Sequence, residues 1–254
     1  MLDKELKILQ GFDPISLSQM DEVALLDRQD TKYLLKRNDF ARILEALQEE
    51  YYALEVVGKR RSHYRTLYFD SQDLLFYNLH QRGKKNRVKI RMRQYVDSSL
   101  TFLEIKLKNN KNRTVKFRKE IEGIHDTLSK DDLDFIDESY RLEEPLKASI
   151  MNDFHRITLV HKKKQERLTF DVDLDFENRK EEHRVLDDLV IAEMKQERFD
   201  RESRFAQLAK QLHIRPERVS KYCLGVALLI DDAKKNRIKE KLRRISKLSE
   251  TLVV

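Results

Sequence analysis

Hydrophobic and polar residues alternate with a period of two along several segments of this chain. In 86–95 (NRVKIRMRQY), Val88, Ile90 and Met92 fall on one side and cationic residues on the other. Because successive side chains of a strand point to opposite faces of a sheet, such alternation predicts strands with one apolar face. The pattern predicts eight strands, at 28–36, 63–70, 86–95, 100–108, 113–121, 154–162, 166–176 and 189–197. Short polar turns between most of them favour an antiparallel sheet or barrel.

Other segments space their apolar residues three and four positions apart, as on one face of a helix. The expected helices are 38–50, 71–79, 129–140, 144–154, 203–212 and 216–231. Asn38 and Ser71 are expected to cap two of them, and Pro216 to begin a third. Residues 1–233 are expected to form a single domain, and 234–254 a basic helical tail. The pattern thus predicts an α+β fold with helices flanking the strands.

The polar faces of the predicted strands are rich in cations. Arg87, Lys89, Arg91 and Arg93 share one face, and the next two strands add further lysines and arginines. Such faces often only point at water, but like charges on neighbouring strands repel unless an anion offsets them. Closing the sheet with this face inward would give a tunnel with cationic walls, suited to a polyanion.

Composition narrows the class of protein. Charged residues make up 38% of the chain and the net charge is +7, which favours an anionic partner. The longest uncharged apolar run, 222–230, has nine residues, against the ~20 that a membrane-spanning helix needs. The single cysteine, Cys223, cannot form an internal disulfide. We therefore expect a cytoplasmic protein.

Nine short motifs occur in order along the chain: RQDTKY, YRTLYFD, KIRMR, LEIKLK, VKFRKEI, HRITLV, ERLTFD, IAEMK and VSKY. Together they resemble the VTC domain, the polyphosphate polymerase branch of the CYTH or triphosphate tunnel metalloenzyme superfamily, from about Arg28 to Leu229. The resemblance implies an eight-stranded antiparallel tunnel barrel that uses Mn²⁺ or Mg²⁺. It also implies that the partners are ATP and inorganic polyphosphate, with no specific nucleic acid. The implied reaction transfers the terminal phosphoryl group of ATP to a growing polyphosphate chain.

The resemblance and the strand faces together suggest roles for particular residues. We expect the catalytic set that holds the reacting phosphates to be Lys32, Arg65, Arg91, Arg93, Lys106, Arg156 and Lys221. We expect further phosphate contacts from Arg28, Lys89, Lys116, Arg118, Arg167 and Lys195. Glu193 is expected to be the main metal ligand, with Glu104 as a second. These roles suit phosphoryl transfer, in which positioning and charge stabilisation do most of the work.

The chain departs from the pattern of the hydrolytic members. Their first strand typically carries Glu-x-Glu-x-Lys, where this chain has Arg28, Asp30 and Lys32, and Lys195 stands where a second acid would follow Glu193. Fewer carboxylates weaken metal-assisted activation of water and strengthen the grip on a long anion, which favours a polymerase. Two alternatives remain: an inorganic or organic triphosphatase on the same barrel, and a non-catalytic module that binds polyanions. The basic tail is either a solvated helix or a peripheral contact with anionic lipid or a membrane protein at the inner face of the membrane.

Overall fold

A large antiparallel sheet forms the centre of the molecule. The computed structural model describes residues 2–22, 29–110 and 114–249. Within them the main strand order is β2-β11-β9-β8-β4-β5-β6-β7, and every pairing is antiparallel except that of β1 with β3. The strands are β1 (Asp13–Ile15), β2 (Gln29–Lys36), β3 (Tyr51–Leu54), β4 (Ser62–Ser71), β5 (Arg87–Tyr95), β6 (Leu100–Lys108), β7 (Thr114–Ile121), β8 (Leu146–His161), β9 (Glu166–Asn178), β10 (His183–Leu186) and β11 (Leu189–Gln196).

All eight predicted strands are present, as β2, β4, β5, β6, β7, β8, β9 and β11. The helix expected at 144–154 is wrong, because β8 begins at Leu146 and pairs with β4 on one side and β9 on the other. Ile150 and Phe154 are buried there in a cluster with residues of neighbouring strands and of the helix at 221–229, and this tertiary packing overrides a helical spacing of apolar residues. The short strands β1, β3 and β10 were not predicted.

Helices cover the sheet, and three of their predicted starts are wrong. They are α1 (Leu2–Gln10), α2 (Leu17–Glu22), α3 (Arg37–Leu47), α4 (Leu75–Gln81), α5 (Lys130–Ser139), α6 (Arg204–Gln211), α7 (Lys221–Leu229) and α8 (Lys239–Leu248), with one short 3-10 turn at Val96–Ser98. Asn38 is not a cap, because α3 follows β2 directly with Lys36 at the N-cap position. Ser71 lies four residues before α4 starts, although its Oγ accepts from Leu75 N at 3.1 Å. Pro216 bridges to Tyr33 instead of beginning a helix.

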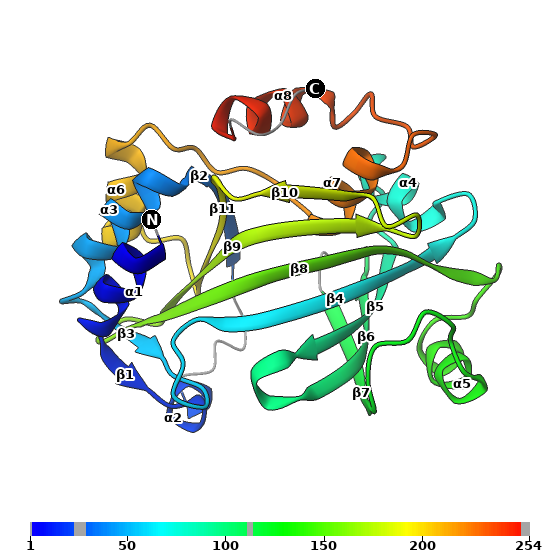
Figure 1. Ribbon diagram of the computed structural model, residues 1–254, viewed down its shortest axis with the longest axis horizontal. Coiled ribbons are helices and arrows are strands. Elements are labelled where there is room, and N and C mark those ends of the chain that lie inside the picture. The colour runs from blue at the N-terminus through cyan, green and yellow to red at the C-terminus, as the bar shows by residue number, and fades with distance from the viewer. Residues whose placement is uncertain (1, 23–28, 111–113, 250–254) are drawn as a thin grey trace.

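Helices surround the sheet (Figure 1), and apolar clusters on both of its faces pack them against it. One cluster joins β2, β8, β9 and β11 to α1, α3 and α6, and another joins β4, β5 and β6 to α5. A third cluster packs α7 and α8 against the other face of the sheet, where Leu242 and Ile245 of α8 are buried. The fold is therefore α+β, a large antiparallel sheet flanked by helices, and the described strands form an open path from β2 to β7.

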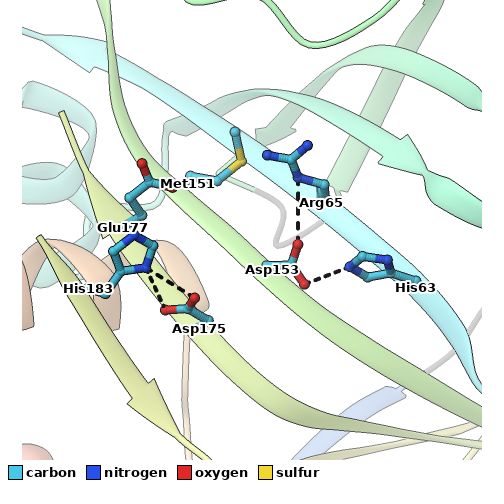
Figure 2. Close-up of a pocket in the computed structure, with 7 residues that line it drawn as sticks. All are labelled: His63, Arg65, Met151, Asp153, Asp175, Glu177 and His183. Carbon is cyan, nitrogen blue, oxygen red and sulfur yellow. Dashed lines mark hydrogen bonds and ion pairs between the residues drawn. The ribbon is translucent and has the colours of Figure 1, made fainter. Parts of the chain in front are cut away.

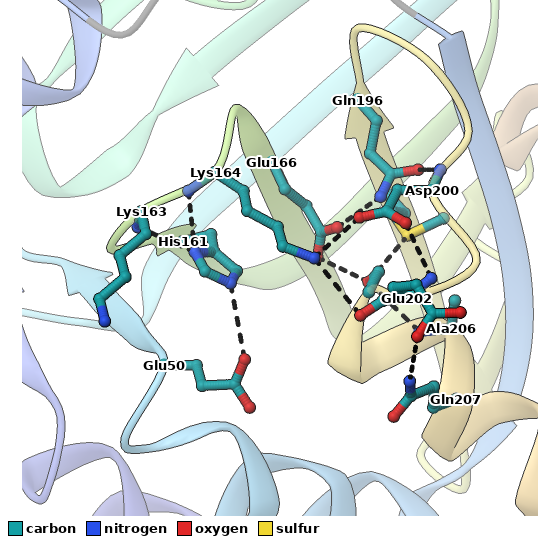
Figure 3. A network of polar contacts seen from close by, with 12 residues as sticks. Glu50, His161, Lys163, Lys164, Glu166, Gln196, Asp200, Glu202, Ala206 and Gln207 are labelled. Atoms are coloured by element: carbon teal, nitrogen blue, oxygen red, sulfur yellow. Dashed lines mark hydrogen bonds and ion pairs between the residues drawn. The ribbon is translucent and has the colours of Figure 1, made fainter.

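A buried polar network fixes one end of the sheet (Figure 3). Glu166 is 2% exposed, and its carboxylate accepts hydrogen bonds from the Tyr51 hydroxyl, the Gln196 amide and Ser203 Oγ. Burial, with the Glu166 charge next in importance, raises the pKa of Tyr51, so the hydroxyl stays a donor. Since a buried carboxylate must be hydrogen-bonded, these three donors hold the start of β9 to β3, to the end of β11 and to the start of α6.

Candidate phosphate-binding site

One face of the sheet gathers cations from seven strands, and we call it the inner face. Paired residues on neighbouring strands point to the same side, so the register places Lys32 with Glu193, Asp171 with Arg156, and Arg91 with Glu104. The predicted residues on this face are Lys32 on β2, Glu193 and Lys195 on β11, Arg167 on β9, Arg156 on β8, Lys89, Arg91 and Arg93 on β5, Glu104 and Lys106 on β6, and Lys116 and Arg118 on β7.

The inner face curves around the start of α7. Ser220 caps this helix, and its Oγ also accepts a hydrogen bond from Lys89 Nζ on β5 at 2.9 Å. Lys221, the next residue, donates to Asp171 on β9. Two further strands, β8 and β4, lie between β9 and β5 in the sheet, so the sheet must bend for both contacts to form. Side chains from strands far apart in the sheet therefore converge near the N-terminus of α7.

Asp171 lies between two cations of the inner face. Its carboxylate accepts from Arg156 Nε at 2.6 Å and Nη2 at 2.9 Å, and from Lys221 Nζ. Burial would raise the pKa of Asp171, but Arg156 and Lys221 together hold it well below its usual range. Burial also lowers the pKa of Lys221 to about 8, although Asp171 opposes this shift. Asp171 is thus a permanent anion, and it is a site residue that the sequence analysis did not select.

Glu193 is the second carboxylate of the inner face, and two lysines surround it. Lys32 donates to its Oε1, and Lys195 Nζ lies 3.6 Å from its Oε2. Against the effect of burial, Lys195 and Lys32 hold the pKa of Glu193 well below the usual range of a carboxyl group. Burial lowers the pKa of Lys195 to about 8, with Glu193 acting in the opposite direction.

Glu104 is the third carboxylate, and it neutralises Arg91. Arg91 Nε donates to Glu104 Oε2 at 2.6 Å, and Lys106 Nζ lies 3.8 Å from the same oxygen. Burial opposes ionisation, yet Arg91 and Lys106 lower the pKa of Glu104 to about 2. Arg93 instead donates to Thr66 Oγ1 at 3.2 Å, and burial and the nearby Arg91 lower its pKa. The cations of the inner face outnumber its carboxylates, so this face attracts anions.

Arg65 was predicted to hold phosphate with the other cations, but it lies on the opposite face of the sheet. On β4 its neighbour Thr66 pairs with Arg93 and shares the inner face, so Arg65 points outward. There it lies 3.6 Å from Asp153, which His63 also contacts at 2.7 Å. These residues line a cavity of about 330 Å³ together with Met151, Asp175, Glu177 and His183 (Figure 2). The cavity has more carboxylates than arginines and lysines, which makes it a poor site for phosphate.

The remaining predicted residues lie at the margins of the inner face or outside the described chain. Lys116 and Arg118 are exposed on β7, the last strand of the sheet order, and Arg118 Cζ stands 5.0 Å from the centre of the Phe102 ring. Arg167 pairs with Lys195 across β9 and β11. Arg28 lies outside the described residues.

The carboxylates suit a metal ion only in part. Among the described residues, no three histidine, cysteine, aspartate or glutamate side chains are grouped closely enough to bind a metal without other ligands. Glu193 and Glu104 each offer one carboxylate, already paired with cations. Mg²⁺ is commonly held by one or two carboxylates together with substrate phosphates. The described residues therefore supply single carboxylates only, and an ion bound here would need phosphate oxygens to complete its ligands.

Solved structures with a similar fold come from several organisms. A conserved hypothetical protein of Pyrococcus furiosus shares 14% identity at a TM-score of 0.42, covering 78% of this chain and 99% of its own. A candidate adenylate cyclase of Bacillus halodurans shares 13% at 0.45, covering 77% and 96%. A candidate adenylyl cyclase of Hippeastrum, described as having a dominant triphosphatase activity, shares 11% at 0.44, covering 79% and 95%. No curated protein matches the chain.

The family model described as VTC domain matches residues 27–230. The chain therefore belongs to the VTC domain family.

The tail does not protrude as an isolated helix. The buried residues of α8 face the third cluster, while Lys239, Arg243 and Lys247 are exposed. Across the part of the chain that the structure describes, no helix is both long and apolar enough to cross a membrane. Contact of the exposed cations with anionic lipid or a membrane protein stays a prediction.

Proposed function

We propose that this protein is an ATP-dependent polyphosphate polymerase whose inner face binds both the triphosphate and the acceptor chain. The position of Lys195 beside Glu193 carries this proposal. A lysine there adds positive charge where a second carboxylate would favour activation of water. Membership of the VTC domain family supports the same conclusion.

The reaction requires no protein nucleophile. A terminal oxygen of the acceptor polyphosphate attacks the γ-phosphorus of ATP, and the bond from that phosphorus to the β–γ bridging oxygen breaks. ADP leaves with the electron pair, and the polyphosphate is longer by one phosphate. Catalysis then depends on aligning the two phosphate groups and offsetting their charge.

The inner face supplies both requirements through its fixed cations. The guanidinium groups of Arg91, Arg93 and Arg156 can each donate two hydrogen bonds to phosphate oxygens. Lys221 and Lys106 add point charges from α7 and β6. Mn²⁺ or Mg²⁺ held by Glu193, with Glu104 as the other carboxylate, would act as a Lewis acid on the triphosphate when bound.

We also propose that the sheet closes into the tunnel of the family. Burial lowers the pKa of Lys89 on β5 to about 8, and the charges of Arg91, Arg87 and then Lys32 on β2 act in the same direction. These strands are well separated in the sheet order, so the coupling supports a strongly curved sheet. A long anion threaded along such a curve would contact cations from many strands at once.

Incubation of the purified protein with ATP and Mn²⁺, followed by electrophoresis of the products, tests the function. A ladder of polyphosphate chains together with ADP is expected. Free phosphate with no chains would make the protein a triphosphatase. Binding of polyphosphate without turnover of ATP would make it a polyanion-binding module.

A further inference from the structure

Three aromatic rings contact one another at one end of the inner face. Tyr64 on β4 and Tyr95 on β5 have ring centres 5.0 Å apart and planes tilted by 58°. Tyr95 and Phe102 on β6 have centres 6.0 Å apart and meet edge to face at 85°. All three residues are half-buried, whereas Phe154, which stacks under Tyr64 at 5.3 Å, is fully buried. We call Tyr64, Tyr95 and Phe102 the aromatic strip.

The strip differs from the apolar core of the same strands. Val88, Ile90 and Met92 point to the outer face and are almost wholly buried under α5 and its neighbours. Tyr95 and Phe102 point instead to the inner face, where the other side chains of β5 and β6, apart from Leu100, are charged. Exposed ring surface among phosphate-binding cations is costly unless a ligand covers it.

Cations border the strip on two sides. Arg93 Cζ lies 5.5 Å from the centre of the Tyr64 ring, and Arg118 Cζ lies 5.0 Å from that of Phe102. Arg91 follows Arg93 along β5 at the next inward position. A ligand with a flat ring at one end and phosphates at the other would match this order of groups.

We propose that the aromatic strip is a stacking platform for the base of a nucleoside triphosphate, in which the base stacks on the ring of Tyr95 or Phe102 and contacts the other ring at its side. This inference rests on the proposed function, because it assigns the base end of the same substrate. Stacking uses the face of the base, which every base has, so the platform distinguishes nucleotides from base-less phosphates more than one base from another.

Calorimetric binding of ATP and of inorganic tripolyphosphate to the purified protein tests the proposal without requiring turnover. Stacking on an aromatic side chain typically contributes about 1–3 kcal/mol per base. Phe102→Leu and Tyr95→Leu should therefore each weaken ATP binding about fivefold or more. Tripolyphosphate has no base, so its affinity should stay within about twofold. Phe117→Leu is the matched control, because Phe117 is a half-exposed phenylalanine on the outward side of β7.

Each result has a clear meaning. Equal loss of both ligands would show that the rings only support Arg93, and would overturn the platform. Unchanged ATP binding in both variants, or equal affinity of the wild-type protein for ATP and tripolyphosphate, would also overturn it. Failure to make polyphosphate chains would contradict the proposed function. The affinities of the variants for ATP and tripolyphosphate, relative to the wild-type protein, would still test the platform. Thermal melts identify any variant that has unfolded. If one of the two variants is unfolded, ATP binding by the other variant tests the proposal.

Discussion

At the scale of single residues, Asp171 shows how the inner face remains folded while carrying excess positive charge. Its side chain is 5% exposed, and it pairs with Arg156 and Lys221 at 17% and 13% exposure. Removing one partner from such a group leaves the others without compensation, which costs more than the pair itself contributes. Asp171 therefore acts as a built-in counter-ion in the absence of substrate.

Replacing Asp171 should lower the stability of the protein and raise its affinity for anions. Asp171→Asn should lower the free energy of unfolding by about 3 kcal/mol, because Arg156 and Lys221 lose their buried anion. Tripolyphosphate should bind more tightly to the variant and restore much of its melting temperature. Chemical denaturation and thermal melts with and without tripolyphosphate measure both effects. Asp175→Asn, on the outward side of β9, is the control, and weaker binding by Asp171→Asn would contradict this role.

Three lysines of the inner face should make phosphate binding sensitive to alkaline pH. Burial lowers the pKa of Lys89, Lys195 and Lys221 to about 8 each. A depressed lysine pKa means that the charge is present below pH 8 and is lost above it. Tripolyphosphate affinity should thus fall about tenfold or more between pH 7 and 9.5, since a charged hydrogen bond contributes about 1.5–3 kcal/mol.

Titration calorimetry across this pH range measures the loss of affinity. Lys195→Arg should bind better than the wild-type protein at pH 9.5, because a guanidinium keeps its charge there. An affinity that is constant with pH would contradict the prediction, because it would show that the three lysines carry the same number of protons in the free and the bound protein.

At the scale of elements, β5 separates stability from binding on its two faces. Met92 is fully buried in the outer cluster, and Arg93 lies on the inner face beside Arg91, whose charge repels it. Met92→Asp should cost more than 3 kcal/mol of stability, because it buries an unpaired charge. Arg93→Ala should change stability by less than about 1 kcal/mol and weaken tripolyphosphate binding about tenfold. Urea unfolding and calorimetry distinguish the two, and the reverse pattern would mean that the strand faces are exchanged.

The strands were predicted better than the helices for a physical reason. In a half-buried strand such as β5, apolar residues on one face alternate with polar residues on the other, so a period of two identifies the strand in the sequence. The first half of β8 has the apolar spacing of a helix but is a strand, because Ile150 and Phe154 are buried by partners far away in the chain. Helix starts failed where tertiary contacts set them: Pro216 bridges to Tyr33, and α7 begins five residues later.

At the scale of the whole molecule, the site is assembled by curvature that no local pattern records. Strand periodicity placed Arg91, Lys106 and Glu193 on a shared face, but it could not show which face of β4 turns inward, hence the error at Arg65. Asp171 was visible as a polar position, yet its role depends on Lys221, which reaches it from α7. The aromatic strip likewise forms only when three strands lie in register.

Under the proposed function, we expect the charge around Glu193 to decide between chain synthesis and hydrolysis. Lys195→Glu would set two carboxylates on the same face of β11 and change the local charge by two units. The added negative charge should repel the acceptor polyphosphate and favour a metal-bound water, so products should be shorter and free phosphate per ATP higher. Lys195→Gln separates the causes, because it removes the cation without adding an acid. Electrophoresis of the chains and a phosphate assay at fixed salt measure both quantities. If Lys195→Glu makes chains of wild-type length, Lys195 does not set the balance, and the proposal must then rest on the other cations of the inner face.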